Sequence, residues 1–436
     1  MYRIEGWPVT FRIPGLRLGL VCLAAASVGL SMAIISISKV LLVLAVLPVL
    51  LFCRRLPADG AALRKMWAPL FATLAVFVFA LSLLWTSAPL DQALGALGKY
   101  GKFLVIPALL VLIRTRQEAF HALVFFLGAQ AFLVISSWLL YFQVPIPWAT
   151  SKMARDYFAV FSSYLDQGIM SAVLAAVFWH LRRLVPDRRW FYAAIALSLL
   201  ALGNVFIVFM GRTGYLVGVA VVSLAIFWAL PRRYRLASLL VPPLLFLIVF
   251  SSSEKVAQRL SAIKIEVSEY SVKPEFRTSS GVRLSLWKTS VEAIAQKPLI
   301  GFGAGSWLTE YNRIERLKNP GHQDFGPKSH GNPHQEFLLW GVQLGVGGIL
   351  LLFAFLGAVL LDLRKMDRSV IWACQSVLLA LVVSCLSNSS LYDAYIGDFF
   401  CVSLGVLLAY GFYSREEDER QNSGGLEPST NVKTGG

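Results

Sequence analysis

Two histidines stand four residues apart where a polar segment runs into an apolar one, in the stretch SHGNPHQEFLLWGVQLGVGG. His330 and His334 have the spacing of two metal ligands on one helical face, but Gly331 and Pro333 disfavour a helix between them. Pro333 suits the first turn of the following helix, so we expect His334 to lie in that turn. The positive end of the helix dipole favours the neutral imidazole there, which can accept a proton.

Three roles are open to this pair: zinc ligands, a buried structural histidine, or a general base. Asp324 and Glu336 are acidic residues near enough in sequence to complete a metal site. A general base must be held within hydrogen-bond reach of the proton that it removes. The helix that follows would hold His334 in place, whereas His330 lies in freer loop. We therefore expect His334 to be the base and name His330 only as a secondary substrate contact.

An arginine stands in FMGRTGYLVG, a tight turn between two apolar stretches. A charge costs about 2.5–3.5 kcal/mol at the centre of a membrane span and less near its end. Arg212 can be an anchor whose side chain reaches the membrane surface. The alternative is that Arg212 binds an anionic substrate, because Gly211 and Gly214 clear space beside it and positive charge is sparse on the outer side of a membrane.

A second arginine lies in TSSGVRLSLWKTSVEAIAQKPLIGFGAGSW. Ser280 can cap a helix that starts near Gly281, and Pro298 ends it. The turn PLIGFGAG is flexible enough to approach a ligand closely. Arg283 and Trp287 are substrate-binding candidates, unless the helix lies on the membrane surface with Arg283 on a lipid phosphate. The predicted apolar face of this helix holds Leu284, Trp287, Val291 and Ile294.

A third positive cluster occurs in LGALGKYGKFLVIP, which the apolar pattern places in another outer loop. Lysines and tyrosines are common at the membrane–water interface, which explains at least one of them without a specific function. Contact with an anionic substrate is the other interpretation. Lys99, Tyr100 and Lys102 are therefore secondary candidates.

The elements that must position these residues are membrane spans. The chain has 436 residues, of which 57% are hydrophobic and 15% charged. One soluble domain could not bury so many apolar residues in its core, so we predict an all-α polytopic membrane protein. About twelve apolar stretches are predicted spans, and the short ones must extend further because crossing takes about 20 residues. They are 18–37, 40–53, 67–85, 103–113, 119–142, 166–181, 190–210, 213–230, 236–251, 336–361, 369–387 and 396–413.

Positive charge follows this predicted topology. With both termini in the cytoplasm, every inner segment is basic, and the inner segments hold more than half of the 40 Lys and Arg residues. Membrane proteins concentrate lysine and arginine in their cytoplasmic loops. The net charge of +15 is explained by this rule and gives no reason to expect nucleic acid as a partner. The short outer loops hold only Lys39, Lys99, Lys102, Lys152, Arg155 and Arg212.

Four parts follow from this topology. Residues 1–250 hold the first nine spans, 251–333 a large outer loop with partly helical, membrane-apposed segments, 334–413 the last three spans, and 414–436 a disordered cytoplasmic tail. A loop of this length is usually functional, whereas the charged, Gly/Ser-rich tail cannot form a core. The sequence contains no Gly-rich phosphate motif of nucleotide-binding enzymes. Its five cysteines lie in or at the ends of apolar stretches and form neither a disulfide framework nor a clustered metal site.

At three places the sequence resembles the O-antigen ligase family, whose members share a domain with O-antigen polymerases and protein O-oligosaccharyltransferases. The first is the arginine in GRTG, in a turn between two mid-chain spans. The second is SGVRLSLW with KPLIGFGAG, similar to the family pattern S-x-x-R-x-x-x-W followed by P-L-x-G-x-G. The third is NPHQEFLLWGVQLGVGG, where a histidine opens the span after the large loop. The family often has His-Asn at that point, and His334-Gln335 keeps the amide.

The resemblance implies a GT-C-like glycosyltransferase of the Gram-negative bacterial inner membrane, with its large loop and active site facing the periplasm. Such an enzyme joins a completed O-antigen, carried on undecaprenyl pyrophosphate, to a sugar hydroxyl of lipid A-core in lipopolysaccharide biosynthesis. It implies inversion at the anomeric carbon without a metal, nucleotide or other cofactor, and membrane lipids as surroundings. At the matching positions, His334 is the catalytic base, and Arg212 and Arg283 bind the donor pyrophosphate.

Two alternatives remain. An O-antigen polymerase or a protein O-oligosaccharyltransferase of the same superfamily would carry similar motifs and differ in its acceptor. A transporter or flippase of the lipid-linked glycan would need charged or polar residues at mid-membrane depth along several spans. The predicted spans are nearly free of charge and the candidate residues gather at the outer face, which favours an enzyme.

Overall fold

The computed structural model describes residues 15–52, 61–244, 279–321, 323–326 and 331–424. Every regular element in these ranges is a helix, which confirms the predicted all-α class. The longer helices and their bounds are α1 (Leu16–Ser27), α2 (Met32–Phe52), α4 (Ala68–Leu81), α5 (Leu90–Tyr100), α6 (Val105–Leu112), α7 (Arg116–Tyr141), α9 (Tyr164–Leu181), α10 (Arg188–Gly203), α11 (Arg212–Ala229), α14 (Ser279–Gln296), α15 (Trp307–Lys318), α16 (Glu336–Leu363), α17 (Arg368–Ser387) and α18 (Ala394–Gly424). Short turns of helix complete the chain at α3 (Ala61–Lys65), η2 (Ser82–Trp85), η3 (Gly101–Leu104), α8 (Lys152–Tyr157), η4 (Asn204–Val208), η5 (Arg232–Tyr234) and η6 (Leu236–Leu240).

Eight helical segments in the described part of the chain are long and apolar enough to cross a membrane. The chain is therefore a multi-pass membrane protein, while the count of twelve spans and the orientation stay predictions. The helix α9 lies at the predicted stretch 166–181 but is not one of the eight, and the predicted stretch 236–251 extends outside the described residues. The eight are Ala68–Trp85, Leu90–Leu112, Arg116–Tyr141, Arg188–Val208, Arg212–Ala229, Glu336–Leu363, Arg368–Ser387 and Ala394–Gln421.

The first two predicted spans were divided at the wrong place. The chain turns between α1 and α2 at residues 28–31, and not at Lys39, which lies inside α2. Its ammonium is 2.7 Å from a carboxylate oxygen of Asp398 in α18. An unpaired charge is costly in a span, and this ion pair removes that cost, so Lys39 does not mark a loop.

The predicted stretch 103–113 was too short, and the structure supplies the missing length on its N-terminal side. A helical segment runs from Leu90 to Leu112, through α5, the 3₁₀ turn η3 and α6. Lys99, Tyr100 and Lys102 therefore lie on helix, and the prediction that they belong to a loop was wrong.

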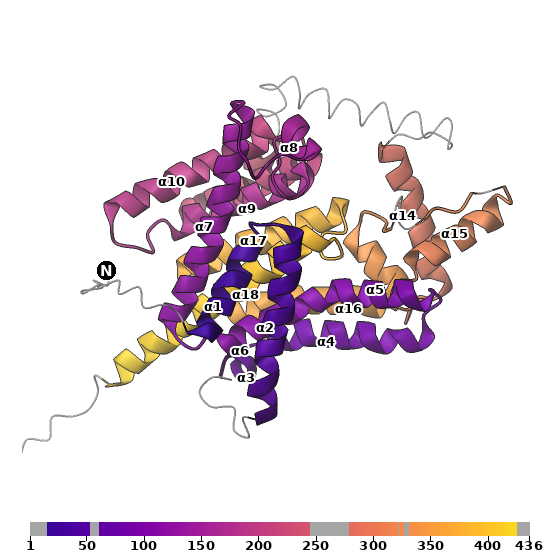
Figure 1. The fold of residues 1–436 in the computed structure, drawn as a ribbon, viewed down its shortest axis with the longest axis horizontal. Helices are drawn as coiled ribbons and strands as arrows, with labels where there is room; N and C mark the ends of the chain where they lie inside the picture. The colour runs from indigo at the N-terminus through magenta and orange to yellow at the C-terminus, as the bar shows by residue number, and fades with distance from the viewer. Residues whose placement is uncertain (1–14, 53–60, 245–278, 322, 327–330, 425–436) are drawn as a thin grey trace, which may run out of the picture.

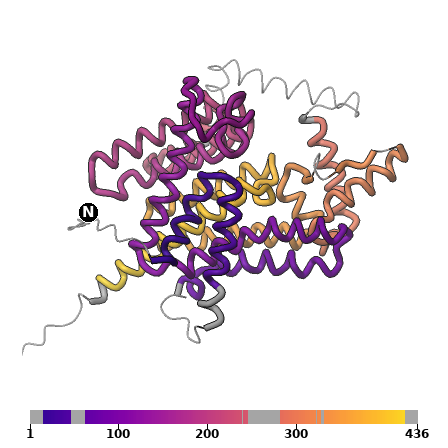
Figure 2. Tube along the Cα trace, in the orientation of Figure 1, coloured from indigo at the N-terminus to yellow at the C-terminus, as the bar shows by residue number. Residues whose placement is uncertain are grey.

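The C-terminal helix α18 forms the centre of the bundle. Its apolar window is completely buried, and α6, α7 and α17 pack along it. Figures 1 and 2 show this yellow helix passing through the middle of the molecule. It continues to Gly424, ten residues beyond the predicted start of the tail at 414, and is supported there by pairs such as Arg415 with Glu419 at 2.7 Å.

Polar capping side chains fix the starts of several helices. Thr115 accepts a hydrogen bond from the Glu118 amide at the start of α7, and Asp367 accepts one from the Ser369 amide at the start of α17. Such caps satisfy amides that have no partner within the helix, typically contributing about 1 kcal/mol each. They explain why the chain can turn sharply between neighbouring spans.

The helix α14 exposes part of the face that the sequence predicted to be its apolar side. Val291 on the predicted face is 55% exposed, whereas Leu286, Ser290 and Ala293 are at most 2% exposed. The Trp307 indole of α15 donates a hydrogen bond to the Ser290 hydroxyl at 2.9 Å. Trp287 and Ile294 of the predicted face do pack against the core, so the prediction is correct for these two residues and wrong for Val291.

The turn PLIGFGAG is joined to a break in α16. At Gly345 the helix backbone has φ 66° and ψ −159°. Around this break the Val346 amide donates to the Pro298 carbonyl at 2.7 Å, and the Gly303 amide donates to the Gln343 carbonyl at 2.8 Å. The close neighbours of the glycines in this turn are the backbones of α16, of α5 and of the segment near Thr86, while its approach to a ligand stays a prediction.

Gly345→Ala is expected to destabilise the protein strongly, by about 2 kcal/mol or more. A side chain at positive φ costs about 1–2 kcal/mol, and a Cβ at this position would lie 2.5 Å from the Pro298 carbonyl oxygen. Gly357→Ala is the matched control in the same helix, because its Cβ would meet nothing within 4 Å. Thermal unfolding of both purified variants in detergent measures the difference, and equal midpoints would contradict the account of the break.

Candidate functional site

His334 lies directly before α16 and not in its first turn. The helix starts at Glu336, and the Gln335 side chain caps it by accepting the Leu338 amide at 2.5 Å. The His334 backbone has φ 52°, a conformation that is uncommon for a residue with a side chain. The Asn332 side-chain oxygen accepts the His334 amide at 2.8 Å and holds this conformation. His334 is thus fixed by a turn between Asn332 and the helix cap.

The His334 ring faces the loop between α17 and α18. Its Nδ1 atom is 3.4 Å from the Asn388 side-chain oxygen. The Asn388 side chain also hydrogen-bonds the Asp393 carboxyl group. An ionised carboxylate can only accept, so in this bond the Asn388 amide nitrogen is the donor. The Asn388 oxygen is then left to accept a hydrogen from Nδ1. This arrangement places the hydrogen on Nδ1, so Nε2 is the ring nitrogen that can accept a proton.

Asp393 joins this group from the other side. The Asn332 amide nitrogen donates to its carboxylate at 3.2 Å. Burial raises the pKa of the Asp393 carboxyl group above its usual range, while the positive charges of His334, Lys102 and Lys99 act in the opposite direction. An ionised Asp393 therefore favours positive charge on its neighbours, including His334.

Glu336 binds the backbone of the same loop through its carboxylate. Its side chain is fully buried and accepts the Leu391 amide at 2.8 Å, the Tyr392 amide at 3.2 Å and the Trp340 indole at 2.9 Å. Glu336 was one of two possible acidic metal ligands, and these three donors give it a positioning role instead. The other, Asp324, pairs with Arg316 at 3.2 Å.

The metal alternative gains no support from the described part of the chain. No three residues of the His, Cys, Asp and Glu types gather there in a way that could hold a metal ion. His330, the other predicted ligand and secondary substrate contact, lies outside the described residues.

The three candidates near the end of α5 have different environments. The Lys99 ammonium lies 3.9 Å from the centre of the Tyr392 ring, and its residue is exposed. Tyr100 is fully buried, stacks on Phe79, and accepts a hydrogen bond from Gln343. Lys102 is 1% exposed, and its ammonium donates to the Asp393 carbonyl at 2.6 Å. Of the three, Lys99 is the one placed to reach a ligand directly.

Arg212 begins α11 beside the end of α17. The Thr213 and Ser387 hydroxyls are 3.0 Å apart, and Ser387 directly precedes Asn388. The tight approach continues at Gly214, where a Cβ would lie 3.3 Å from the Gly168 backbone of α9. The space that Gly214 was predicted to leave beside Arg212 is thus partly filled by the backbone of α9. The Arg212 residue itself is half-buried.

Arg283 approaches from the other side, on α14. Trp287, four residues later and so on the same face, donates its indole hydrogen to the Pro333 carbonyl at 3.0 Å. Pro333 is the residue before His334. Arg283 is thus carried by a helix that contacts the residue before His334, and Arg212 by a helix that contacts the residue before Asn388. The starts of α11, α16 and α18 meet the end of α17 at one end of the bundle.

A family model described as O-Antigen ligase matches residues 197–353, from α10 into α16. This segment belongs to the O-antigen ligase family. The resemblance found in the sequence is confirmed, and the O-antigen ligase segment includes Arg212, Arg283 and His334. O-antigen ligase family members are glycosyltransferase-like enzymes with lipid-linked glycan and lipid acceptor substrates in general. No curated protein matches the chain.

Sequence reasoning missed the part of the site that lies outside this O-antigen ligase segment. Asn388 and Asp393 belong to the stretch SNSSLYDAYIGD, a polar run between two predicted spans. The sequence contained two indications that this stretch belongs to the site: it is polar, and the predicted topology places it on the same outer side as His334. Only the folded structure shows that it lies against the histidine.

The spans also contain more charge than the sequence pattern suggested. Lys39 and Asp398 form an ion pair between α2 and α18, and Lys102 is buried near them. Asp398 lies within the first two turns of α18, and Lys102 contacts the residue before this helix, Asp393. They lie next to the His334 group, and in the described spans they do not form the continuous line of charge that a transport path would require.

Proposed function

We propose that the protein is an O-antigen ligase, which transfers a completed glycan from undecaprenyl pyrophosphate to a sugar hydroxyl of lipid A-core at the periplasmic face of the inner membrane. The observation that carries this proposal is the meeting of the three motif-bearing elements around His334, within or beside the matched family segment. The twelve-span topology, the large periplasmic loop and the domain boundaries given above are part of the proposal.

His334 acts as the general base. The acceptor hydroxyl loses its proton to Nε2 as its oxygen attacks the anomeric carbon of the glycan. The bond between that carbon and the pyrophosphate oxygen breaks, with inversion, and the lipid pyrophosphate leaves with the electron pair. Asn388 orients the ring through Nδ1, and Asp393 stabilises the imidazolium that forms. Positioned bases typically accelerate such steps by about 10²–10⁴-fold.

Arg212 and Arg283 stabilise the leaving pyrophosphate. Negative charge on the leaving group grows in the transition state, so cations aimed at it act selectively there. The guanidinium fork matches two phosphate oxygens at once. Lys99, whose residue is exposed beside Tyr392, is a further contact for the glycan or its pyrophosphate. Lys102 and Tyr100 are buried; in this scheme Lys102 positions the start of α18, and Tyr100 positions the part of α16 around Gln343.

Reconstitution tests the proposal. The purified full chain in lipid vesicles receives a glycan on undecaprenyl pyrophosphate together with lipid A-core, and the products are separated by mass. A glycan joined to lipid A-core supports the ligase. A longer glycan on the same lipid identifies a polymerase, and a product formed only with an added protein acceptor identifies a protein transferase. Movement of the glycan lipid across the membrane without a new bond would overturn the enzyme assignment.

Asp393→Asn is expected to move the acid side of the rate–pH profile to lower pH by about one unit. In the wild type, the rate falls as pH falls because protonated His334 cannot accept the acceptor proton. The burial-raised pKa of Asp393 means that its charge is also lost on the acid side. Without the carboxylate, imidazolium forms less readily, so a lower pH is needed to protonate the base, and the maximal rate falls because the base is weaker.

Asp324→Asn is the control for this profile, since Asp324 is paired with Arg316 outside the His334 group. Initial rates at saturating substrates, measured in overlapping buffers, give the profiles. An Asp393→Asn profile identical to that of the wild type would refute the electrostatic role of Asp393.

Transfer is expected to persist in EDTA. The described residues offer no cluster of ligands for a divalent ion, and the arginines already supply cationic charge for the pyrophosphate. The measurement compares initial rates before and after dialysis against the chelator. Complete loss in EDTA that one added metal restores would show that a metal takes part.

A further inference from the structure

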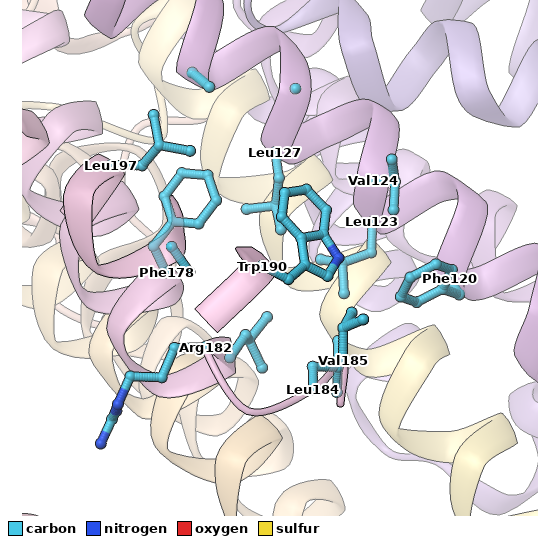
Figure 3. Close-up of a pocket in the computed structure, with 14 residues that line it drawn as sticks. Phe120, Leu123, Val124, Leu127, Phe178, Arg182, Leu184, Val185, Trp190 and Leu197 are labelled. Carbon is cyan, nitrogen blue, oxygen red and sulfur yellow. The ribbon is translucent and has the colours of Figure 1, made fainter. Parts of the chain in front are cut away.

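An apolar groove lies between α7, α9 and α10, as Figure 3 shows. Its volume is about 160 Å³. Arg182 contributes its stem to the wall, while its guanidinium group points away from the groove in Figure 3 and lies 4.1 Å from the Trp179 ring. The groove is suited to hydrocarbon and not to a polar group. Its lining includes Leu123, Leu127, Phe178, Trp190 and Leu197.

The groove is at the opposite end of the bundle from His334. It lies in the first half of α7 and at the end of α9, and its wall residue Phe120 packs against Tyr410, near the middle of the central helix. The His180 ring of α9 contacts Trp372 near the start of α17. The other end of α17 reaches Asn388 at the site, and its 20 residues span about 30 Å at 1.5 Å each. The groove therefore lies toward the end of these helices that is far from His334.

Positive charge surrounds the mouth of this groove. The connection between α9 and α10 and the first two residues of α10 hold four arginines within eight residues, and Arg183, Arg188 and Arg189 are exposed. The one acidic residue there, Asp187, is engaged as the cap of α10 through the Arg189 amide. Trp190 stands between these arginines and the groove, as aromatic residues do at membrane interfaces. An apolar slot below a basic rim is complementary to a lipid with a negative head group.

We propose that this groove binds an anionic phospholipid, with one acyl chain between α7, α9 and α10 and its phosphate at Arg183, Arg188 and Arg189. The inference needs the membrane-spanning fold and is independent of the proposed glycan transfer. The bound lipid fills space that the three helices leave open and joins the α9–α10 connection to the membrane surface.

Native mass spectrometry of the full chain in mild detergent tests this site. Phosphatidylglycerol and phosphatidylcholine with identical acyl chains are added in parallel, and we expect the anionic lipid to bind about tenfold more tightly. The triple variant Arg183→Gln, Arg188→Gln and Arg189→Gln should bind both lipids equally. Gly128→Leu should weaken both by about tenfold, because a Cβ at this groove residue meets open space that the larger side chain fills.

The matched control is the double variant Arg232→Gln and Arg233→Gln, which removes exposed charge from another basic turn whose residues do not line this groove. It should keep the preference for phosphatidylglycerol. If Gly128→Leu does not fold, Ala131→Leu fills the same groove. The proposal is overturned if the wild type binds both lipids equally, if the control loses as much preference as the triple variant, or if the filled groove retains wild-type affinity.

Discussion

His334→Ala should lose nearly all glycan transfer, by about 10²–10⁴-fold, while still binding the lipid-linked donor. The sugar hydroxyl is a poor nucleophile, so loss of the proposed base should slow its attack on the anomeric carbon. The two arginines that we propose as pyrophosphate ligands remain in this variant. Initial rates of transfer and a separate donor-binding measurement on the same purified protein distinguish loss of the base from loss of substrate.

His330→Ala is the paired variant and should keep a sizeable fraction of activity. Asn388→Ala adds a second check, because it removes the partner of Nδ1 without removing the base. It should lower the rate less than His334→Ala does. An inactive His330→Ala beside an active His334→Ala would reverse the assignment. If both histidine variants are active, charge stabilisation and substrate positioning carry the catalysis alone.

Arg212→Ala and Arg283→Ala should each reduce turnover at least about tenfold, because a charge-assisted contact contributes roughly 1.5–3 kcal/mol. The pyrophosphate gains charge as it leaves, so the loss should fall mainly on turnover rather than on donor affinity. Arg→Lys at either position should restore only part of the rate, since an ammonium cannot make the paired contact. Steady-state kinetics of the reconstituted protein measure both quantities.

Arg316→Ala serves as the matched control, since this arginine pairs with Asp324 on α15 and its side chain is 58% exposed. Its turnover should equal that of the wild type. Unfolding temperatures of all variants must agree before rates are compared. Wild-type turnover in both Arg212→Ala and Arg283→Ala would refute their assignment to the pyrophosphate.

The spans could be predicted from the sequence wherever hydrophobicity alone decides the structure. They could not be predicted where a residue distant in the chain lowers the free-energy cost of placing a charge in a span. Lys39 was read as a loop residue because a lone charge is expensive inside a membrane. Its partner Asp398 is 359 positions away in the chain, so no local pattern contains the ion pair. The same reason explains the division of α1 from α2, where the Tyr395 hydroxyl donates to the Leu30 carbonyl at 2.7 Å.

The site could be predicted in part because short motifs carry its charged residues. His334, Arg212 and Arg283 are each recognisable from their neighbours in the sequence. The sequence places His334 in the first turn of the helix because Pro333 suits that position. In the structure α16 starts later, at Glu336, because Gln335 is its N-cap. Asn388 and Asp393 could not be assigned, because their role arises only when the end of α17 lies against the histidine.

Membrane insertion of α16 depends on a segment that the ribosome makes first. Within hydrocarbon, an unpaired backbone group costs several kcal/mol, and the break at Gly345 disrupts the internal bonding of the helix. Pro298 and Gly303 bond backbone groups beside that break. They precede α16 in the chain, so these partners already exist when the broken helix emerges. Because synthesis starts at the N-terminus, the turn that contains Pro298 and Gly303 is made before α16. The hydrogen-bond partners for the interrupted part of this helix are therefore present when it is made.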